Sequence, residues 1–252
     1  MQARKLKWVA VYAVAMAYVE AAAVVYLRRI GGIGDLLRDV APYDPLIAAI
    51  ELGREGATLV MILAVGFAAG RSRQARLGFA CFAFGAWDIV YYVWLRVMLR
   101  WPGSLLAPDI LFLIPLPWWG PVLAPVLVAL LSILGGAIAV IHDDRGRPMR
   151  LAAAGWAALL AGMVAVLYAF MADALRALPA GPETLNRLRP TAFDWPVFLT
   201  GYLAMTWAVW RAGRRAGRLE TVPVGPDRSP EQRLARQGVD VDDRVEADRA
   251  GD

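Results

Sequence analysis

The chain has 252 residues, of which 59% are hydrophobic and only 19% are charged, with a formal net charge of +5. A soluble domain would carry about 25% charged residues, so the composition excludes an ordinary soluble protein and indicates an integral membrane protein. Cys81 and His142 are the only residues of their types, which excludes an intrachain disulfide, zinc sites built from cysteine or histidine clusters, and bis-histidine haem ligation. We therefore expect no cofactor, and the sequence does not decide whether a metal ion binds.

Six stretches are predicted to be membrane-spanning helices, since a span needs about 20 mostly apolar residues. In chain order they are Trp8–Leu27, Leu46–Ala69, Leu77–Leu99, Val122–Ile141, Leu151–Met171 and Trp195–Trp210. The predicted fold class is all-α, a polytopic transmembrane helix bundle formed by residues 1–218. For the first stretch the alternative is a cleaved signal peptide ending near Ala21–Ala23, and the charge of Glu20 beside that site argues against it.

The distribution of Lys and Arg predicts the orientation of the bundle, because cytoplasmic loops carry the excess of positive charge. With six spans, one side of the membrane receives 13 Lys and Arg and the other receives 8. Both termini are therefore expected to be cytoplasmic, as an even number of spans requires. The predominance of Arg over Lys, together with much Ala, is typical of GC-rich bacterial genomes. We expect a multi-pass protein of a bacterial inner membrane.

The region before the fourth span is too long for one helix. Residues 108–141 would form a helix of about 50 Å at 1.5 Å per residue, whereas the hydrocarbon core is about 30 Å thick. Prolines also interrupt it, namely Pro115, Pro117 and Pro121. We expect Pro108–Trp119 to be a re-entrant or interfacial segment rich in Pro and Trp. A kinked start of the fourth helix is the alternative.

Residues 219–252 differ from the rest of the chain in composition. They carry nine Asp and Glu, five Arg and few large apolar side chains. Such a segment cannot bury enough apolar surface to order itself, so we expect a disordered acidic cytoplasmic tail.

Charged residues lie inside the predicted spans, where each one costs about 2.5–3.5 kcal/mol at the centre of the bilayer. On the second span, Glu51, Arg54 and Glu55 share one helix face through their i+3 and i+4 spacing. Glu20 lies on the first span and Asp88 on the third. We predict that these five residues bind an ion or protons in one outward-facing cavity. Supporting residues are predicted from neighbouring positions, namely Trp87, Tyr91, Tyr92, Arg96, Asp109 and Asp194. The alternative is that the charges only lock helices together.

The stretch REGAT at Arg54–Thr58 resembles part of the R-E-G-x-E motif of the iron permease family, in which carboxylates carry ferric ion. Thr58 stands where that motif has its second Glu, and the chain holds no second copy of the motif. Only Arg54 and Glu55 correspond to the motif, so the resemblance implies ion handling rather than membership of the family.

These features favour a protein that binds or transports a cation, protons or a proton-coupled small solute, rather than an enzyme. One alternative is a membrane-embedded enzyme that modifies a lipid or isoprenoid by acid catalysis, which requires a carboxylic acid kept protonated in an apolar site. Another is a structural subunit of a membrane complex. The expected partners are the lipid bilayer and a cation or small-molecule substrate, with no nucleic acid. Association with a second copy of the chain or with a membrane complex is left open.

Overall fold

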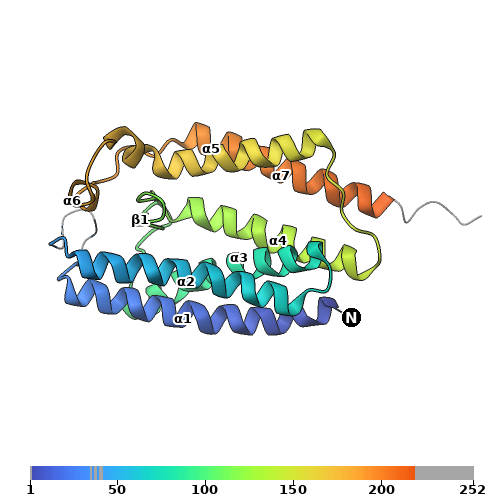
Figure 1. Ribbon diagram of the computed structural model, residues 1–252, viewed down its shortest axis with the longest axis horizontal. Coiled ribbons are helices and arrows are strands. Elements are labelled where there is room, and N and C mark those ends of the chain that lie inside the picture. Colours follow the sequence, from blue (N-terminus) through green and yellow to red (C-terminus); the bar gives the residue numbers. More distant parts are fainter. Residues whose placement is uncertain (1, 35, 37–38, 40–41, 219–252) are drawn as a thin grey trace, which may run out of the picture. The chain divides into compact units, whose positions relative to one another are not determined.

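The protein is a bundle of helices with one short β-hairpin (Figure 1). The computed structural model describes residues 2–34, 36, 39 and 42–218, so the predicted tail, 219–252, lies outside the described residues. Every described helix and strand begins within one compact unit, Met1–Gly217. In chain order the elements are η1 (Gln2–Lys5), α1 (Leu6–Ile30), α2 (Pro45–Ala69), α3 (Arg73–Leu99), β1 (Pro108–Ile110), β2 (Trp119–Pro121), α4 (Leu123–Asp144), α5 (Ala153–Ala177), α6 (Pro182–Asn186) and α7 (Trp195–Arg218).

All six stretches predicted as spans are helical, as α1, α2, α3, α4, α5 and α7. Their ends differ from the prediction by at most six residues, except that α7 continues for eight residues beyond Trp210 to Arg218. Local sequence explains two of the starts. The Asp44 carboxylate accepts the amide hydrogen of Leu46 at 2.8 Å ahead of α2, and the Ser72 hydroxyl accepts that of Ala75 at 3.0 Å ahead of α3. Asp and Ser are preferred at this position because their oxygens satisfy amides that the first helical turn leaves unpaired.

Four helices are long and apolar enough to cross a membrane: Gln2–Ile30, which joins η1 to α1, together with α3, α4 and α5. Their length and composition make the chain a membrane protein. The helix α2 carries three charges near its middle, and α7 ends in a segment with four Arg. The crossing of α2 and α7, and with it the six-span topology, stays a prediction.

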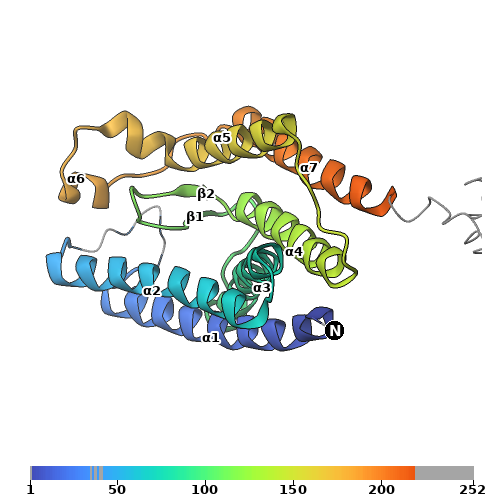
Figure 2. The same ribbon diagram turned by 45° about the vertical axis from the view of Figure 1, so that its right-hand side comes forward.

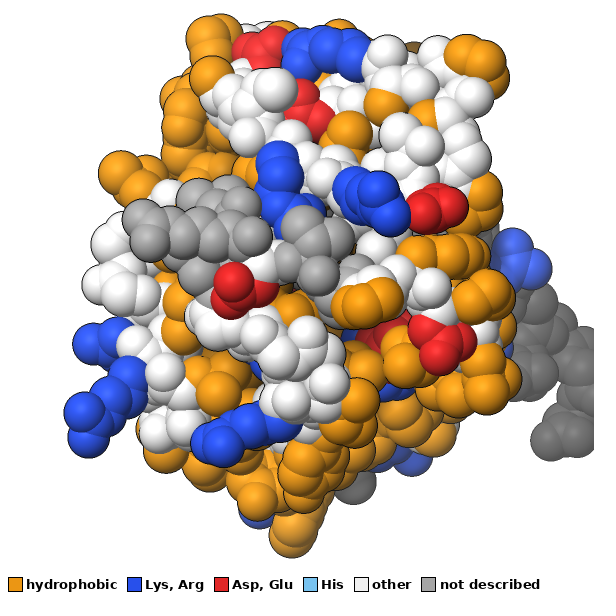
Figure 3. All heavy atoms as spheres, turned by 90° about the vertical axis from the view of Figure 1, so that its left-hand side faces the viewer, with side chains coloured by type: hydrophobic (Ala, Val, Ile, Leu, Met, Phe, Trp, Pro, Cys, Tyr) orange, Lys and Arg blue, Asp and Glu red, His pale blue; other side chains and the backbone are white. Residues whose placement is uncertain are grey.

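The sides of the bundle are apolar. Every long helix exposes large hydrophobic side chains, among them Val11, Leu63, Val97, Leu134, Val164 and Leu203. Figure 3 looks onto the end of the bundle that carries α6, where Lys, Arg, Asp and Glu side chains are scattered over the face and hydrophobic side chains border it. Exposed apolar flanks around a charged end are what a bilayer-embedded bundle requires, because lipid replaces water around the flanks.

The helix α3 is the central element of the N-terminal half and contacts α1, α2 and α4. Figures 1 and 2 show α1 and α2 on one side, α5 and α7 on the opposite side, and α4 between them. Glycines allow close approach, since a Cβ added at Gly85 would overlap the carbonyl oxygen of Ala129, and Gly162 and Gly201 face each other across α5 and α7. Small residues at such crossings are typical of membrane helices.

The helix α1 is part of the core of the bundle. Ala13, Ala17 and Ala21 are fully buried, and Ala13 and Ala17 belong to one apolar cluster with Phe79 and Ala83 of α3. Removal of α1 as a signal peptide would expose this cluster, so the packing favours a retained helix.

The segment before α4 is a β-hairpin rather than a helix. The strands β1 and β2 pair antiparallel, with Asp109 opposite Gly120, and the Leu111 amide donates to the Trp118 carbonyl oxygen at 2.9 Å beyond them. The region is therefore broken before α4, as the prolines predict, and the alternative of a kinked helix start is wrong. Contact of the hairpin with the membrane stays a prediction.

Aromatic rings hold the hairpin between the two sides of the bundle. The ring of Phe112 lies 6.3 Å from that of Trp87 on α3, and the ring of Trp118 lies parallel to that of Phe170 on α5 at 6.1 Å. Rings at these separations contact one another favourably. The hairpin thus connects α3 to α5 through its tip.

Candidate functional site

The charged face of α2 meets α1 through an ion-pair cluster. The Arg54 guanidinium donates to the Glu51 carboxylate at 2.8 and 3.0 Å and forms a second ion pair with Glu20 of α1. The Thr58 hydroxyl donates to the other oxygen of Glu20 at 3.3 Å. We name Glu20, Glu51, Arg54 and Thr58 the Arg54 cluster. The i+3 spacing of Glu51 and Arg54 produces half of it, and helix packing supplies the rest.

Glu55 projects from the same helix but binds the hairpin. Its side chain is buried, and its two oxygens lie 3.0 and 2.9 Å from the amide nitrogen of Leu113 at the hairpin tip. An amide in a loop has no partner from regular secondary structure and is costly to bury unpaired. Glu55 therefore anchors the hairpin to α2.

Asp109 of β1 is the centre of a second polar cluster. Its carboxylate is 3% exposed, accepts a hydrogen bond from the Tyr92 hydroxyl at 3.1 Å, and lies 3.6 Å from the Arg28 guanidinium. Arg28 also lies over the ring of Trp101 at 4.3 Å. Burial raises the pKa of Asp109 to about 6, although Arg28 and the hydrogen bond from Tyr92 oppose that rise.

Asp88 is buried on α3 with little to compensate its charge. The residue is 9% exposed, and its Oδ2 atom has no hydrogen-bond partner among the described residues. Asp88 lies one helical turn before Tyr92 on α3, and the Tyr92 hydroxyl donates to the Asp109 carboxylate, so the two acids meet on the same side of α3. We name Arg28, Asp88, Tyr92 and Asp109 the Asp109 cluster. Tyr91 lies within range of the charges of both clusters.

The predicted site residues are thus divided between the two clusters and the hairpin anchor. The structure brings Glu20, Glu51 and Arg54 into direct contact, whereas Asp88 interacts with Asp109, which was expected only as a supporting residue. No described hydrogen bond or ion pair joins Asp88 to Glu55. Arg28 was missed, because its place at the end of an apolar stretch made it count as a loop charge.

The other supporting residues have separate roles. Trp87 is buried in the apolar cluster of α1 and α3. Arg96 donates to the carbonyl oxygens of Arg100 and Pro102 where α3 ends. The Asp194 carboxylate accepts the Val197 amide hydrogen at 3.2 Å and so caps α7.

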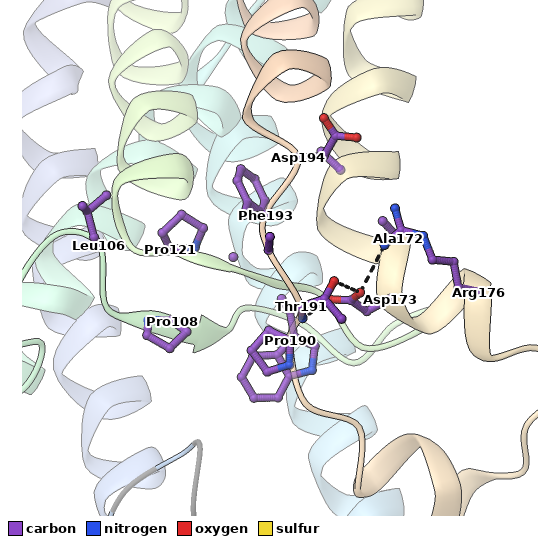
Figure 4. Close-up of a pocket in the computed structure, with 14 residues that line it drawn as sticks. Leu106, Pro108, Pro121, Ala172, Asp173, Arg176, Pro190, Thr191, Phe193 and Asp194 are labelled. Atoms are coloured by element: carbon purple, nitrogen blue, oxygen red, sulfur yellow. Dashed lines mark hydrogen bonds and ion pairs between the residues drawn. The ribbon is translucent and has the colours of Figure 1, made fainter.

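A pocket of about 270 Å³ lies elsewhere, between the hairpin, α5 and the chain that leads into α7 (Figure 4). Its polar wall centres on Asp173, which accepts hydrogen bonds from the Thr191 amide and hydroxyl at 2.9 and 2.6 Å and lies 3.3 Å from Arg176. Of all predicted site and supporting residues, only Asp194 lines it. The predicted cavity around Glu55 and Asp88 therefore stays a proposal.

Comparison with known proteins gives no relative: no family model, curated protein or solved structure matches the chain. Within residues 2–34, 36, 39 and 42–218, no three His, Cys, Asp or Glu side chains are grouped so that they could hold a metal ion. The function is therefore inferred from the two polar clusters alone.

Proposed function

We propose that the protein binds protons or a small cation at buried carboxyl groups and passes them across the membrane. The observation that carries the proposal is an excess of acid inside the bundle. Within the part of the chain that the structure describes, five buried or half-buried carboxyl groups meet two guanidinium groups in this region. The acids are Glu20, Glu51, Glu55, Asp88 and Asp109, and the bases are Arg28 and Arg54.

Full ionisation would leave three negative charges without a guanidinium. At about 2.5–3.5 kcal/mol for each charge at the centre of a bilayer, the uncompensated excess would cost about 8–10 kcal/mol. Bound protons or a bound cation would offset this cost. Intramembrane acids that exchange protons are a recurrent device of pumps and transporters.

We place this function in a six-span protein of a bacterial inner membrane with both termini cytoplasmic. In support, α1 begins and α7 ends at the same end of the bundle, while α6 and the hairpin lie at the other (Figure 1). The 13 Lys and Arg that the sequence assigns to the cytoplasmic side fall at the first of these ends. The hairpin end, with both polar clusters near it, would then face outward.

Acid catalysis on a lipid is less well supported. The pocket that would hold a substrate contains Asp173, and its carboxylate receives two hydrogen bonds and an ion pair. Glu55 and Asp88, the acids that such an enzyme was expected to use, do not line this pocket. The alternative to be tested is a structural subunit of a membrane complex, because the ion pairs of the Arg54 cluster taken alone could serve to hold helices together.

Proton flux can be measured with purified protein in liposomes that contain a pH-sensitive dye, after a potassium gradient and valinomycin impose a membrane potential. We expect acidification or alkalinisation that follows the sign of the potential, and its loss in Asp88→Asn. The matched control is Glu183→Gln, which removes an exposed acid on α6 that pairs with Arg187. Wild-type liposomes that show no flux of protons, and none of sodium in a parallel tracer assay, would contradict the proposal.

A further inference from the structure

We propose that Asp88 and Asp109 form a paired-carboxyl site that holds one proton, assembled from α3 and the hairpin. The inference deepens the proposed function and rests on it for the role of that proton in transport. Proton binding itself is a separate property and can be tested without any flux.

Unequal hydrogen bonding distinguishes the two carboxyl groups. Asp109 has a hydroxyl donor in Tyr92 and a guanidinium in Arg28, so its ionised form is stabilised. Asp88 is also buried, but its Oδ2 atom has no donor among the described residues. A buried oxygen without a donor disfavours the anion. The proton is therefore expected on Asp88, with Asp109 as the neighbouring anion.

The cations around Asp88 and Asp109 are one too few to neutralise both carboxylates. From α1 the pair faces Arg28, from α2 the nearest cation is Arg54, and from α3 it faces the hydroxyls of Tyr91 and Tyr92. The helix α4 carries no charged residue before His142. Arg54 is already shared by Glu20 and Glu51. Among the described residues only Arg28 remains for two carboxylates, and two like charges that share one site cannot both ionise cheaply.

The same comparison excludes the other acids as the favoured proton site. Glu20 and Glu51 each contact the Arg54 guanidinium, and Glu55 accepts a backbone amide hydrogen. Each of these contacts stabilises the carboxylate. Asp88 is the acid that lacks one.

Infrared spectroscopy of the protein in lipid nanodiscs tests the site, because a protonated carboxyl group absorbs at a higher frequency than a carboxylate and shifts in D₂O. We expect a protonated-carboxyl band that persists above about pH 6, where Asp109 is ionised and cannot account for it. Asp88→Asn should remove the band, and Glu183→Gln should leave it unchanged. A band that survives Asp88→Asn overturns the site.

Two further variants keep the test decisive if Asp88→Asn does not fold. Asp109→Asn removes the neighbouring negative charge, so the midpoint of the band should fall by about one pH unit or more. Tyr92→Phe keeps both acids and removes a donor to Asp109, so the midpoint should rise. A midpoint that neither variant moves would also overturn the pairing. If the wild-type protein shows no such band, the paired-carboxyl site is wrong, and the flux measurement still tests the proposed function. If the band is present but no flux is measured, only the proposal of transport is contradicted.

Discussion

Glu55 on α2 holds the backbone amide of Leu113 with its two carboxylate oxygens at 3.0 and 2.9 Å. An acid of a helix that is predicted to cross the membrane here satisfies irregular backbone, which is tolerated at membrane depth only where protein surrounds it. The aromatic contacts of Phe112 and Trp118 position the hairpin tip, and Glu55 supplies its described polar anchor to α2.

The first prediction concerns this anchor. Glu55→Ala should leave the Leu113 amide without its partner, and hydrogen bonds to charged groups contribute about 1.5–3 kcal/mol. Hydrogen exchange at Leu113, measured by mass spectrometry in detergent, should become about 10- to 100-fold faster. Glu55→Gln keeps one acceptor oxygen and should have a smaller effect. Unchanged exchange in Glu55→Ala would show that the rings alone hold the tip.

The second prediction concerns the Arg54 cluster. Arg54→Ala would leave Glu20 and Glu51 unpaired, and removal of one partner from a buried pair typically costs about 3–5 kcal/mol. We expect a large fall in thermal stability, partly recovered when Glu20→Gln and Glu51→Gln are added. The control is Arg187→Ala, which breaks an exposed pair on α6 and should cost no more than about 1 kcal/mol. Equal effects at the two positions would refute a buried role for Arg54.

The third prediction compares two glycines by the same substitution. Gly85→Ala would push a Cβ into the carbonyl oxygen of Ala129, which belongs to the backbone of α4 and cannot rotate away. Overpacking of this kind costs about 1–3 kcal/mol. Gly53→Ala meets no atom within 4 Å, so it should leave stability unchanged or raise it by up to about 1 kcal/mol. Thermal unfolding of the two variants checks both signs.

The fourth prediction follows from the pKa of Asp109, which rises from 3.8 to about 6 in the folded protein. The folded state holds this proton more tightly than the unfolded state, so its contribution is complete below about pH 4 and is lost as the pH rises through about 6. The full difference is about 3 kcal/mol. Thermal stability should therefore fall over this range, and Asp109→Asn should flatten that part of the profile. A variant profile parallel to that of the wild type would contradict the assignment.

The fifth prediction tests topology after Cys81→Ser removes the native thiol. A membrane-impermeant maleimide should label Thr184→Cys, on exposed α6, from outside intact cells. Arg145→Cys, in the loop after α4, should react only after the cells are opened. The reverse pattern would invert the orientation, and labelling of both from outside would exclude six spans.

Hydropathy predicted the helices well because a long apolar run has few ways to satisfy its backbone in a membrane. The Glu51–Arg54 contact followed from helical spacing alone. The partnership of Asp109 with Arg28 and Tyr92 could not be predicted, because it depends on how the hairpin folds back between helices. The same fold separates Asp194 from the other acids by placing it at the start of α7, where its role is to cap the helix.

Pro108 and Asp109 are consecutive in β1, yet Pro108 lines the pocket while Asp109 is buried against Arg28 and Tyr92. Successive side chains of a strand point to opposite faces. The backbone of β1 therefore lies between the pocket and the buried Asp109 carboxylate. Here a charge that enters the pocket would act on Asp109 through protein rather than water, where its field is far less screened. A charged ligand in the pocket would thus change the electrostatic potential at Asp88 and Asp109.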